Sequence, residues 1–338
     1  MEKVMSRTPL GSVTEREIRS QPEIWRTTMQ QLEPPAMPTG SSSYLASGCG
    51  STFYVARWLA RHAELDVGTP VRALPASELL LAPRAWSHAP SHTPLVAISR
   101  SGATSETIRA LQGWDGPRLA VTCDAASELA ATTQTRVDLD HAAEESVVQT
   151  RSFTSMMLGA LSLFRTAPED VGDTLRNAGE QVLQQADELV ERVLAVGVPR
   201  RVVVLGSGPR YGLACEAALK LTEVALVEAQ AFHTLEVRHG PMSMIGDGTL
   251  VIGLFDVDEP LERQVLTDMA ALGATICVVA ATPGVRGADL APNDVVAEGW
   301  REVLLLPFVQ LLGLEMARRR GADPDRPENL TAVVTLDA

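Results

Sequence analysis

The segment VAISRSGATSET, residues 96–107, joins a short apolar run to a hydroxyl-rich turn, and it decides the fold expected for the chain. The apolar run predicts a buried strand, and the residues after the glycine return to a helical pattern. Ser99, Ser101, Thr104 and Ser105 would then lie at the amino end of a helix. Free backbone N–H groups and the helix dipole favour a phosphate there. An ordinary N-cap is the alternative, because any helix favours serine and threonine at that position.

Apolar runs alternate with helical patterns on both sides of this segment, which predicts an α/β fold with parallel sheets. The predicted strands are 44–47, 71–74, 95–98, 118–122, 201–205, 250–254 and 275–279. A Gly-x-Gly turn follows the first strand at 48–50 and recurs at 206–208, so we interpret the chain as a duplication of one α/β unit. The apolar spacing over 171–196 predicts a long connecting helix.

These patterns divide the chain into five expected parts. They are a helical lead-in (1–40), a first α/β domain (41–170), a connecting helix (171–198), a second α/β domain (199–320) and a tail (321–338). Within the lead-in, Ser12 and Glu15 have the spacing of a capping box, and Pro22 is expected to open a second helix.

The composition excludes several classes of function. With 338 residues, 45% of them hydrophobic, the chain can bury a core large enough for two domains of ~150 residues. Its net charge of −13 argues against nucleic acid or an anionic membrane as partner. The first twenty residues lack the apolar run of a secretory signal, and the run 155–164 is too short to span a bilayer.

The cysteines and histidines point to a cytoplasmic protein without a metal. The four cysteines are far apart with no CxxC spacing, which is typical of reduced thiols. The six histidines show no zinc-like clustering. Cys49 lies in the first glycine turn, where it is either a nucleophile or a small buried side chain.

Other motif-based functions find little support. Neither Gly-x-Gly turn continues as G-x-G-x-x-G, which argues against dinucleotide binding, and no P-loop, HExxH or GxSxG occurs. The two copies also differ after their third strand, which in the first copy leads into the hydroxyl-rich turn. The strand 250–254 leads into FDVDEP, residues 255–260, whose acidic side chains would repel a phosphate. We therefore expect one anion site per chain, in the first half.

A second polar cluster comprises Lys220, Glu223, Glu236 and His239. Lys220 and Glu223 are three residues apart on one predicted helix, so a surface ion pair is the simplest interpretation. His239 precedes a Gly-Pro pair, which is also compatible with a plain turn residue. A glutamate and a histidine near a bound sugar phosphate would, however, supply the groups needed to move protons on the sugar.

Four motifs together resemble the sugar isomerase (SIS) family, in particular the isomerase half of glucosamine-6-phosphate synthase. They are GCGST (48–52), SRSGAT (99–104), AALKLTE (217–223) and EVRHGP (236–241). The resemblance runs from EIRSQP (17–22) to DRPENL (325–330). It implies two tandem flavodoxin-like SIS domains, each a parallel sheet with helices on both faces, and a ligand at the carboxyl ends of the strands.

The resemblance also implies roles for individual residues. It assigns the 6-phosphate of a sugar to Thr52, Ser99, Arg100, Ser101 and Thr104. Cys49, Ser51 and Lys220 are expected to complete the substrate site.

The catalytic residues implied by the resemblance are Glu223 and His239. Glu223 would move a proton between C1 and C2 of the sugar, and His239 would open the pyranose ring from the neighbouring subunit of a homodimer. No cofactor is implied.

Two departures from the synthase narrow the expected reaction. Met1-Glu2 leads directly into the sugar domain, so we expect no glutaminase activity. Ala332 stands where the synthase tail has a lysine, which rules out a Schiff base at that position. Arg100 replaces a glutamine and is expected to strengthen phosphate binding.

We therefore expect an amino-sugar-phosphate deaminase/isomerase that converts glucosamine 6-phosphate to fructose 6-phosphate and ammonia. Two alternatives remain, a fructosamine-6-phosphate deglycase and a sugar-phosphate sensor without catalysis. Against the sensor, no basic helix-turn-helix precedes the unit, and both Glu223 and His239 are present.

Overall fold

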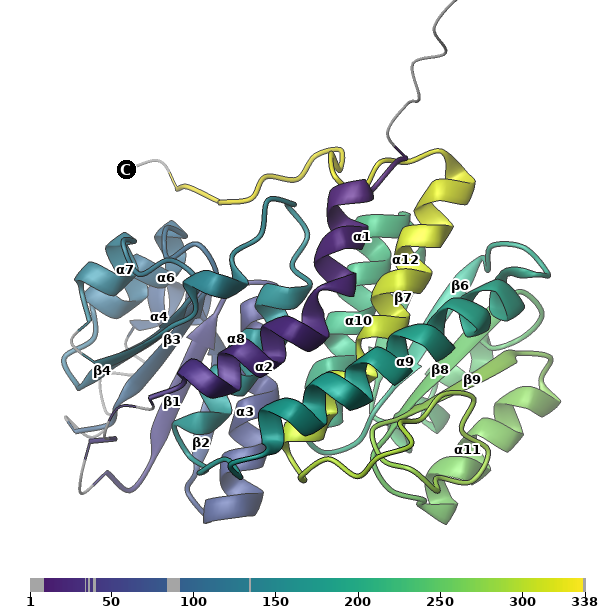
Figure 1. The fold of residues 1–338 in the computed structure, drawn as a ribbon, viewed down its shortest axis with the longest axis horizontal. Helices are drawn as coiled ribbons and strands as arrows, with labels where there is room; N and C mark the ends of the chain where they lie inside the picture. Colours follow the sequence, from purple (N-terminus) through teal and green to yellow (C-terminus); the bar gives the residue numbers. More distant parts are fainter. Residues whose placement is uncertain are drawn as a thin grey trace, which may run out of the picture.

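The computed structural model describes residues 9–33, 35, 37–38, 41–83, 92–133 and 135–336, apart from the side chains of residues 66 and 67. Two parallel β-sheets lie side by side with helices between and around them (Figure 1). The predicted α/β class with parallel sheets is thus confirmed. The predicted lead-in (1–40) falls partly outside the described residues.

The first sheet has the strand order β2-β1-β3-β4-β5, and the second has the order β7-β6-β8-β9. The strands of the first are β1 (Tyr44–Gly48), β2 (Val71–Pro75), β3 (Leu95–Ser99), β4 (Arg118–Thr122) and β5 (Thr135–Asp138). Those of the second are β6 (Arg201–Leu205), β7 (Glu228–Phe232), β8 (Thr249–Phe255) and β9 (Thr275–Ala280). Every pairing within each sheet is parallel.

The helices form a central layer and two outer ones. In the centre lie α1 (Ser12–Arg19), α2 (Gln21–Gln31), α3 (Ser51–Val67), α8 (Arg151–Ser162), α9 (Val171–Leu194), α10 (Arg210–Ala225) and α12 (Pro307–Arg320). The outer helices are α4 (Ala76–Leu81), α6 (Ser105–Gln112) and α7 (Glu128–Ala131) on the first sheet, and α11 (Pro260–Ala271) on the second. The predicted long helix is α9.

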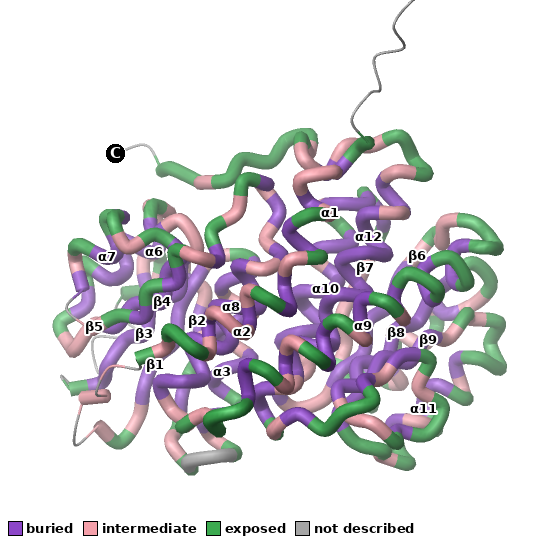
Figure 2. The backbone as a smooth tube through the Cα atoms, in the orientation of Figure 1, coloured by how far each residue is buried: buried purple, intermediate pink, exposed green. Residues whose placement is uncertain are grey.

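Alternation along the strands explains this layering. Successive strand side chains point to opposite faces of a sheet. On β1, Tyr44 and Ala46 join the central core, whereas Leu45 packs with the outer helices α4, α6 and α7. On β6, Val202 belongs to the central core and Val203 to the outer one. Each sheet therefore needs helices on both faces, and Figure 2 shows that burial is greatest in the centre.

The central core is continuous between the two sheets, because α3 and α10 pack against each other. A buried carboxylate reinforces this junction. Glu302, in the 3₁₀ helix η4 (Trp300–Leu305), accepts a 2.5 Å hydrogen bond from Trp58 Nε1 and lies 3.0 Å from His62 Nε2. Since Trp58 and His62 belong to α3, the carboxylate ties the first half of the chain to the last.

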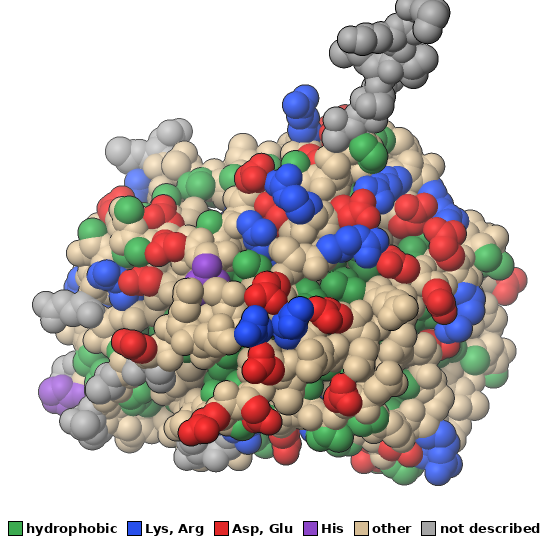
Figure 3. All heavy atoms as spheres, in the orientation of Figure 1, with side chains coloured by type: hydrophobic (Ala, Val, Ile, Leu, Met, Phe, Trp, Pro, Cys, Tyr) green, Lys and Arg blue, Asp and Glu red, His purple; other side chains and the backbone are tan. Residues whose placement is uncertain are grey.

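The surface over α1, α2, α9 and α12 carries intermixed charges (Figure 3). Arg26 pairs with Asp173 at 2.8 Å, and Arg19 pairs with Asp187 at 2.9 Å. Exposed pairs of this kind contribute little to stability, because water and salt screen the attraction. The face is solvated rather than a basic binding surface.

The capping box predicted at Ser12 and Glu15 is wrong. The N-cap of α1 is Gly11, and the backbone N–H groups of Val13 and Thr14 donate to the Asp325 carboxylate at 2.9 and 2.8 Å. The cap thus comes from the far end of the chain. Pro22, by contrast, lies in the first turn of α2 as predicted.

None of the helices in the described part of the chain has the length and hydropathy that crossing a bilayer requires.

Candidate active site

The hydroxyl loop, residues 99–105, connects β3 to α6 and opens at the carboxyl edge of the first sheet. Gly102 adopts a φ of 57°, and a Cβ built there would meet Ser127 Oγ at 2.0 Å. Only glycine fits this position, because both the backbone conformation and the space exclude a side chain. Thr104 is the N-cap of α6, but its side chain makes no capping hydrogen bond. The amino end of α6 thus keeps polar groups with which an anion could pair.

A second tight turn, residues 48–52, lies where β1 enters α3. Thr52 Oγ1 accepts a hydrogen bond from the Cys49 N–H at 2.9 Å and donates one to the Cys49 carbonyl at 3.0 Å. The Thr52 hydroxyl therefore closes the turn, and Ser51 is buried beside it. Burial raises the pKa of the Cys49 thiol, and Sγ lies 3.5 Å from Thr107 Oγ1. These properties favour a small packing residue over a nucleophile.

The Arg100 guanidinium contacts backbone carbonyls of neighbouring segments. Nη1 donates to the carbonyls of Ser146 and Val147 at 3.1 Å each and lies 3.8 Å from Glu144 Oε2, while Nη2 donates to the Ala332 carbonyl at 3.3 Å. These contacts use both Nη1 donors and one Nη2 donor of the guanidinium. The geometry supports a role in fixing neighbouring segments, and direct phosphate binding by Arg100 stays a prediction.

Helix α10 carries the proton-handling candidates. Lys220 is 3% exposed, and its Nζ donates to Glu223 Oε2 at 2.6 Å. The same ammonium lies 3.5 Å from Glu216 Oε1. This is no surface ion pair of the kind that the spacing alone suggested, because Lys220 is buried and Glu223 is partly open to solvent.

Burial governs the charges of this cluster. Burial raises the pKa of Glu216 to about 8, although the Lys220 ammonium opposes the shift. For Lys220, burial lowers the pKa, but the charges of Glu216, Glu223 and Glu144 outweigh it and raise the pKa above its usual value. At pH 7 a protonated Glu216 and a charged Lys220 keep the cluster close to electrical balance.

Glu144 links the hydroxyl loop to helix α10. Its buried carboxylate accepts hydrogen bonds from the backbone N–H and hydroxyl of Thr150 at 2.7 and 2.6 Å and lies 3.8 Å from Arg100. Its charge also acts on Lys220. The sequence analysis missed Glu144, because one of two adjacent glutamates in a polar segment carries no recognisable motif.

His239 lies apart from this cluster in the single chain. It follows the 3₁₀ helix η2 (Glu236–Arg238), is exposed, and donates its backbone N–H to the Glu236 carbonyl at 2.9 Å. Within the described residues, its imidazole makes no hydrogen bond or ion pair with the Lys220 and Glu223 cluster. The structure therefore brings Glu223 and Lys220 together but leaves His239 free to meet another molecule.

The tail crosses the hydroxyl loop, as Figure 1 shows for the segment after α12. The Ser105 N–H donates to the Val334 carbonyl at 3.3 Å, and Ser105 Oγ accepts from the Leu336 N–H at 3.3 Å. An N–H group at the start of α6 thus has a tail carbonyl as its partner. Ala332 lies close to the loop, where its carbonyl accepts from Arg100.

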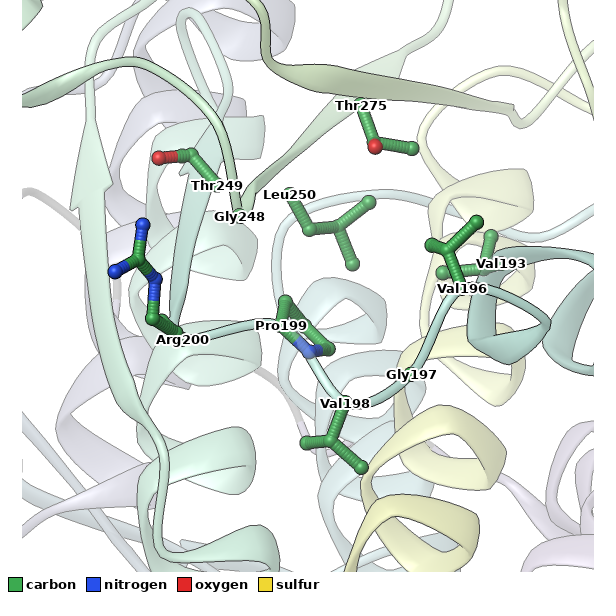
Figure 4. A pocket seen from close by; sticks show the side chains of 10 residues that line it. All are labelled: Val193, Val196, Gly197, Val198, Pro199, Arg200, Gly248, Thr249, Leu250 and Thr275. Carbon is green, nitrogen blue, oxygen red and sulfur yellow. The ribbon is translucent and has the colours of Figure 1, made fainter.

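A small hollow of about 90 Å³ on the second sheet is not this site (Figure 4). It is lined by residues at the beginnings of β8 and β9, including Thr249 and Thr275, and by the segment before β6. Ligands of parallel α/β sheets bind at the carboxyl ends of the strands, and this hollow lies at the amino ends.

Comparisons with known proteins find relatives that match nearly the whole chain. A D-galactosamine-6-phosphate deaminase from Escherichia coli is 27% identical over 94% of this chain and 92% of its own length. A glutamine–fructose-6-phosphate aminotransferase from Caulobacter vibrioides is 30% identical over 72% of this chain, but the match spans only 44% of the aminotransferase. No protein-family model matches the chain.

Among solved structures, a glucosamine-6-phosphate deaminase from Thermotoga maritima superimposes with a TM-score of 0.82. The two are 25% identical, and the match covers 96% of this chain and all of the other. The fold, the site and these relatives define an enzyme of the phosphosugar isomerase and deaminase type. These relatives and structural neighbours are phosphosugar isomerases and deaminases with sugar isomerase (SIS) domains, and the chain is similar to them along nearly its whole length.

Proposed function

We propose that the enzyme is an amino-sugar-phosphate deaminase/isomerase, which converts glucosamine 6-phosphate and water to fructose 6-phosphate and ammonia. The observation that carries the proposal is the buried Lys220 in contact with the partly open Glu223, on a helix packed beside α3. The deaminase names of the relatives from E. coli and T. maritima support the same reaction class.

In this proposal the hydroxyl loop anchors the 6-phosphate. Ser99, Ser101, Thr104 and the amino end of α6 would bind it, and Ser51 and Thr52 would complete the binding surface from the turn before α3. For this, the hydrogen bond from the Ser105 N–H to the Val334 carbonyl would have to break. The N–H would then donate to the phosphate instead. A phosphate fixed far from C1 and C2 would orient those carbons toward α10.

Glu223 then moves the proton. Its carboxylate would take the proton from C2 of the open-chain aldose and return it to C1, which converts the 2-amino aldehyde to a 2-imino compound. Water adds to the C2 imine, and ammonia leaves with the formation of the ketone. Lys220 orients the Glu223 carboxylate through the 2.6 Å hydrogen bond. Ala332 has no amine, so it cannot form an imine with the sugar.

We further propose a homodimer in which His239 of one copy opens the sugar ring in the site of the other. His239 is exposed, and within the described residues its imidazole makes no hydrogen bond or ion pair with the α10 cluster; both observations support this arrangement. We also propose that the two sheets are two tandem SIS domains with the predicted boundaries. A cytoplasmic location is compatible with the four cysteines, all of which are free.

The test is ammonia release from glucosamine 6-phosphate and, in parallel, from galactosamine 6-phosphate. The wild type is expected to release ammonia from at least one, and Glu223→Gln is expected to be slower by about 10²–10⁴-fold with little change in sugar-phosphate affinity. Glu228→Gln, on β7, is a matched control expected to keep full activity.

The outcomes separate the alternatives. Ammonia from neither amino sugar, with turnover of a fructosamine 6-phosphate, would replace the deaminase by a deglycase. Binding of sugar phosphates without turnover of any of the three would make the protein a sensor.

A further inference from the structure

A second hollow, separate from the hydroxyl loop, lies between α3, β2 and α10. We call it the arginine hollow, and its volume is about 380 Å³. The lining residues that matter here are Phe53, Arg57, Arg61, Arg72, Tyr211 and His233. None of its described lining residues is acidic. The chain has a net charge of −13, yet three arginines and no acidic residue are among the described residues that line this hollow.

Arg57 has unused hydrogen-bonding capacity at the centre of this hollow. Its guanidinium lies 4.6 Å from the centroid of the Tyr211 ring, interacts with the Tyr211 side chain, and donates a 3.9 Å hydrogen bond to Cys215 Sγ. Sulfur is a weak acceptor, whereas a guanidinium offers five N–H donors. Within the described residues, no carboxylate forms an ion pair with Arg57, although the side chain is half-buried.

The surrounding groups increase the positive field and provide aromatic surfaces. Arg61 pairs with Glu64 at 2.5 Å, so its charge is partly balanced, while Arg72 is exposed on the edge strand β2. His233 stacks on Tyr211 with the ring centroids 3.8 Å apart. Burial and the charges of Arg57 and Arg61 lower the pKa of His233, although Glu236 opposes this shift. The lowered pKa favours the neutral form of the imidazole.

We propose that the arginine hollow binds a phosphate monoester. A dianionic phosphate accepts several charge-assisted hydrogen bonds from guanidinium groups, and the rings of Tyr211, His233 and Phe53 can contact an organic substituent. The hollow is separate from Glu223, because Tyr211 precedes Glu223 by twelve residues on α10, or about 18 Å along the helix, whereas Glu216 is only five residues, about 7.5 Å, from Tyr211. The proposal does not depend on the reaction proposed above.

Isothermal titration with three probes tests the site: inorganic phosphate, glucose 6-phosphate and adenosine monophosphate. The wild type, Arg57→Gln and Arg192→Gln are compared, since Arg192 is an exposed arginine that pairs with Asp289 outside the hollow. We expect Arg57→Gln to weaken one class of binding site about tenfold or more, while Arg192→Gln binds like the wild type. The probe that binds most tightly identifies the source of the phosphate.

Unchanged binding of all three probes to Arg57→Gln would overturn the proposal. This holds even if the substitution changes the oligomeric state of the protein. Loss of binding in both arginine variants would also overturn it, because the effect would then reflect net charge alone. If Arg57→Gln does not fold, Arg72→Gln replaces it with the same expected result. Ser101→Ala, in the hydroxyl loop, is expected to leave this class of site intact.

Discussion

Glu216 is a buried carboxyl group whose Oε1 lies 3.5 Å from the Lys220 ammonium. Its pKa of about 8 in the folded protein exceeds the ordinary value of 4.5, mainly because of burial. Between these two pH values the folded state binds more protons than the unfolded state. The contribution of Glu216 to the free energy of unfolding is therefore complete below pH 4.5 and is lost as the pH rises through about 8.

Glu216→Gln should remove this dependence on pH. Relative to the wild type, the variant is expected to gain stability as the pH rises from 4.5 to about 8, by on the order of 1–4 kcal/mol. Urea unfolding at several pH values measures the difference in free energy of unfolding between the variant and the wild type. The titrations of His141 and His233 are common to both proteins and cancel in the difference. Glu180→Gln, an exposed carboxylate on α9, should follow the wild type throughout; an equal response of both variants would contradict the assignment.

A substitution at Gly102 tests whether the hydroxyl loop requires a glycine at this position. Gly102→Ala forces a side chain into a φ of 57° and against Ser127, so we expect a loss of about 1–3 kcal/mol in the free energy of unfolding and weaker sugar-phosphate binding. Gly113→Ala is the matched control at the other end of α6, where φ is −78° and the added Cβ would lie no closer than 3.4 Å to other atoms. Equal stability of the two variants would refute the proposed constraint.

The hydroxyl loop was predictable from the sequence because its strand, turn and helix are local. The cap on α1 was not, because Asp325 and Thr14 are 311 positions apart. The same limit applies to Glu144, Arg100 and the tail, whose contacts join segments that carry no common pattern. Residue identities at the site follow from motifs, whereas their hydrogen-bond partners follow from the tertiary fold.

At the scale of elements, the missed strands share one property. β5 and β7 are both edge strands, and both lack the continuous apolar run of a strand buried on two faces. The predicted strands are mostly central and almost fully buried, as β3 and β8 illustrate. An apolar run in the sequence reflects burial of a strand on both faces. The central strands of a parallel sheet are therefore predicted more readily than its edge strands.

The packing of α3 on α10 depends on Gly212. A Cβ there would meet the Trp58 backbone nitrogen at 2.9 Å and the Tyr54 carbonyl at 3.1 Å. Because backbone atoms cannot move aside cheaply, Gly212→Ala is expected to cost about 1–3 kcal/mol and to lower turnover by displacing α10. Gly313→Ala, in α12, meets only side chains at 3.6 Å or more and should be neutral or slightly stabilising. Thermal unfolding of both variants measures the two changes in stability.

At the scale of the whole molecule, the two sheets are unequal copies. The edge of the second sheet that corresponds to the hydroxyl loop is occupied by ion pairs. Arg301 binds Asp256 at 2.5 and 2.7 Å, and Arg210 lies 3.5 Å from Glu262, which also accepts from Thr234 at 2.9 Å. Internal carboxylates and guanidinium groups thus satisfy each other there. This arrangement argues against a phosphate at the acidic segment after β8, as the sequence predicted.

A shared active site would make two inactive proteins active together. In a dimer that combines one Glu223→Gln subunit with one His239→Ala subunit, one site loses both groups and the other keeps both. Random mixing gives half mixed dimers, so we expect about a quarter of the wild-type activity after co-refolding of equal amounts.

The measurement is ammonia release before and after subunit exchange, with each variant alone as the baseline. Mixing Glu223→Gln with Glu223→Ala is the control, because every site in that mixture lacks the glutamate. Recovery in the first mixture alone places His239 and Glu223 in different subunits of one site. No recovery in either, with exchange verified by native mass spectrometry, would mean that His239 acts within its own chain or not at all, and the exposed turn after η2 would then need another role.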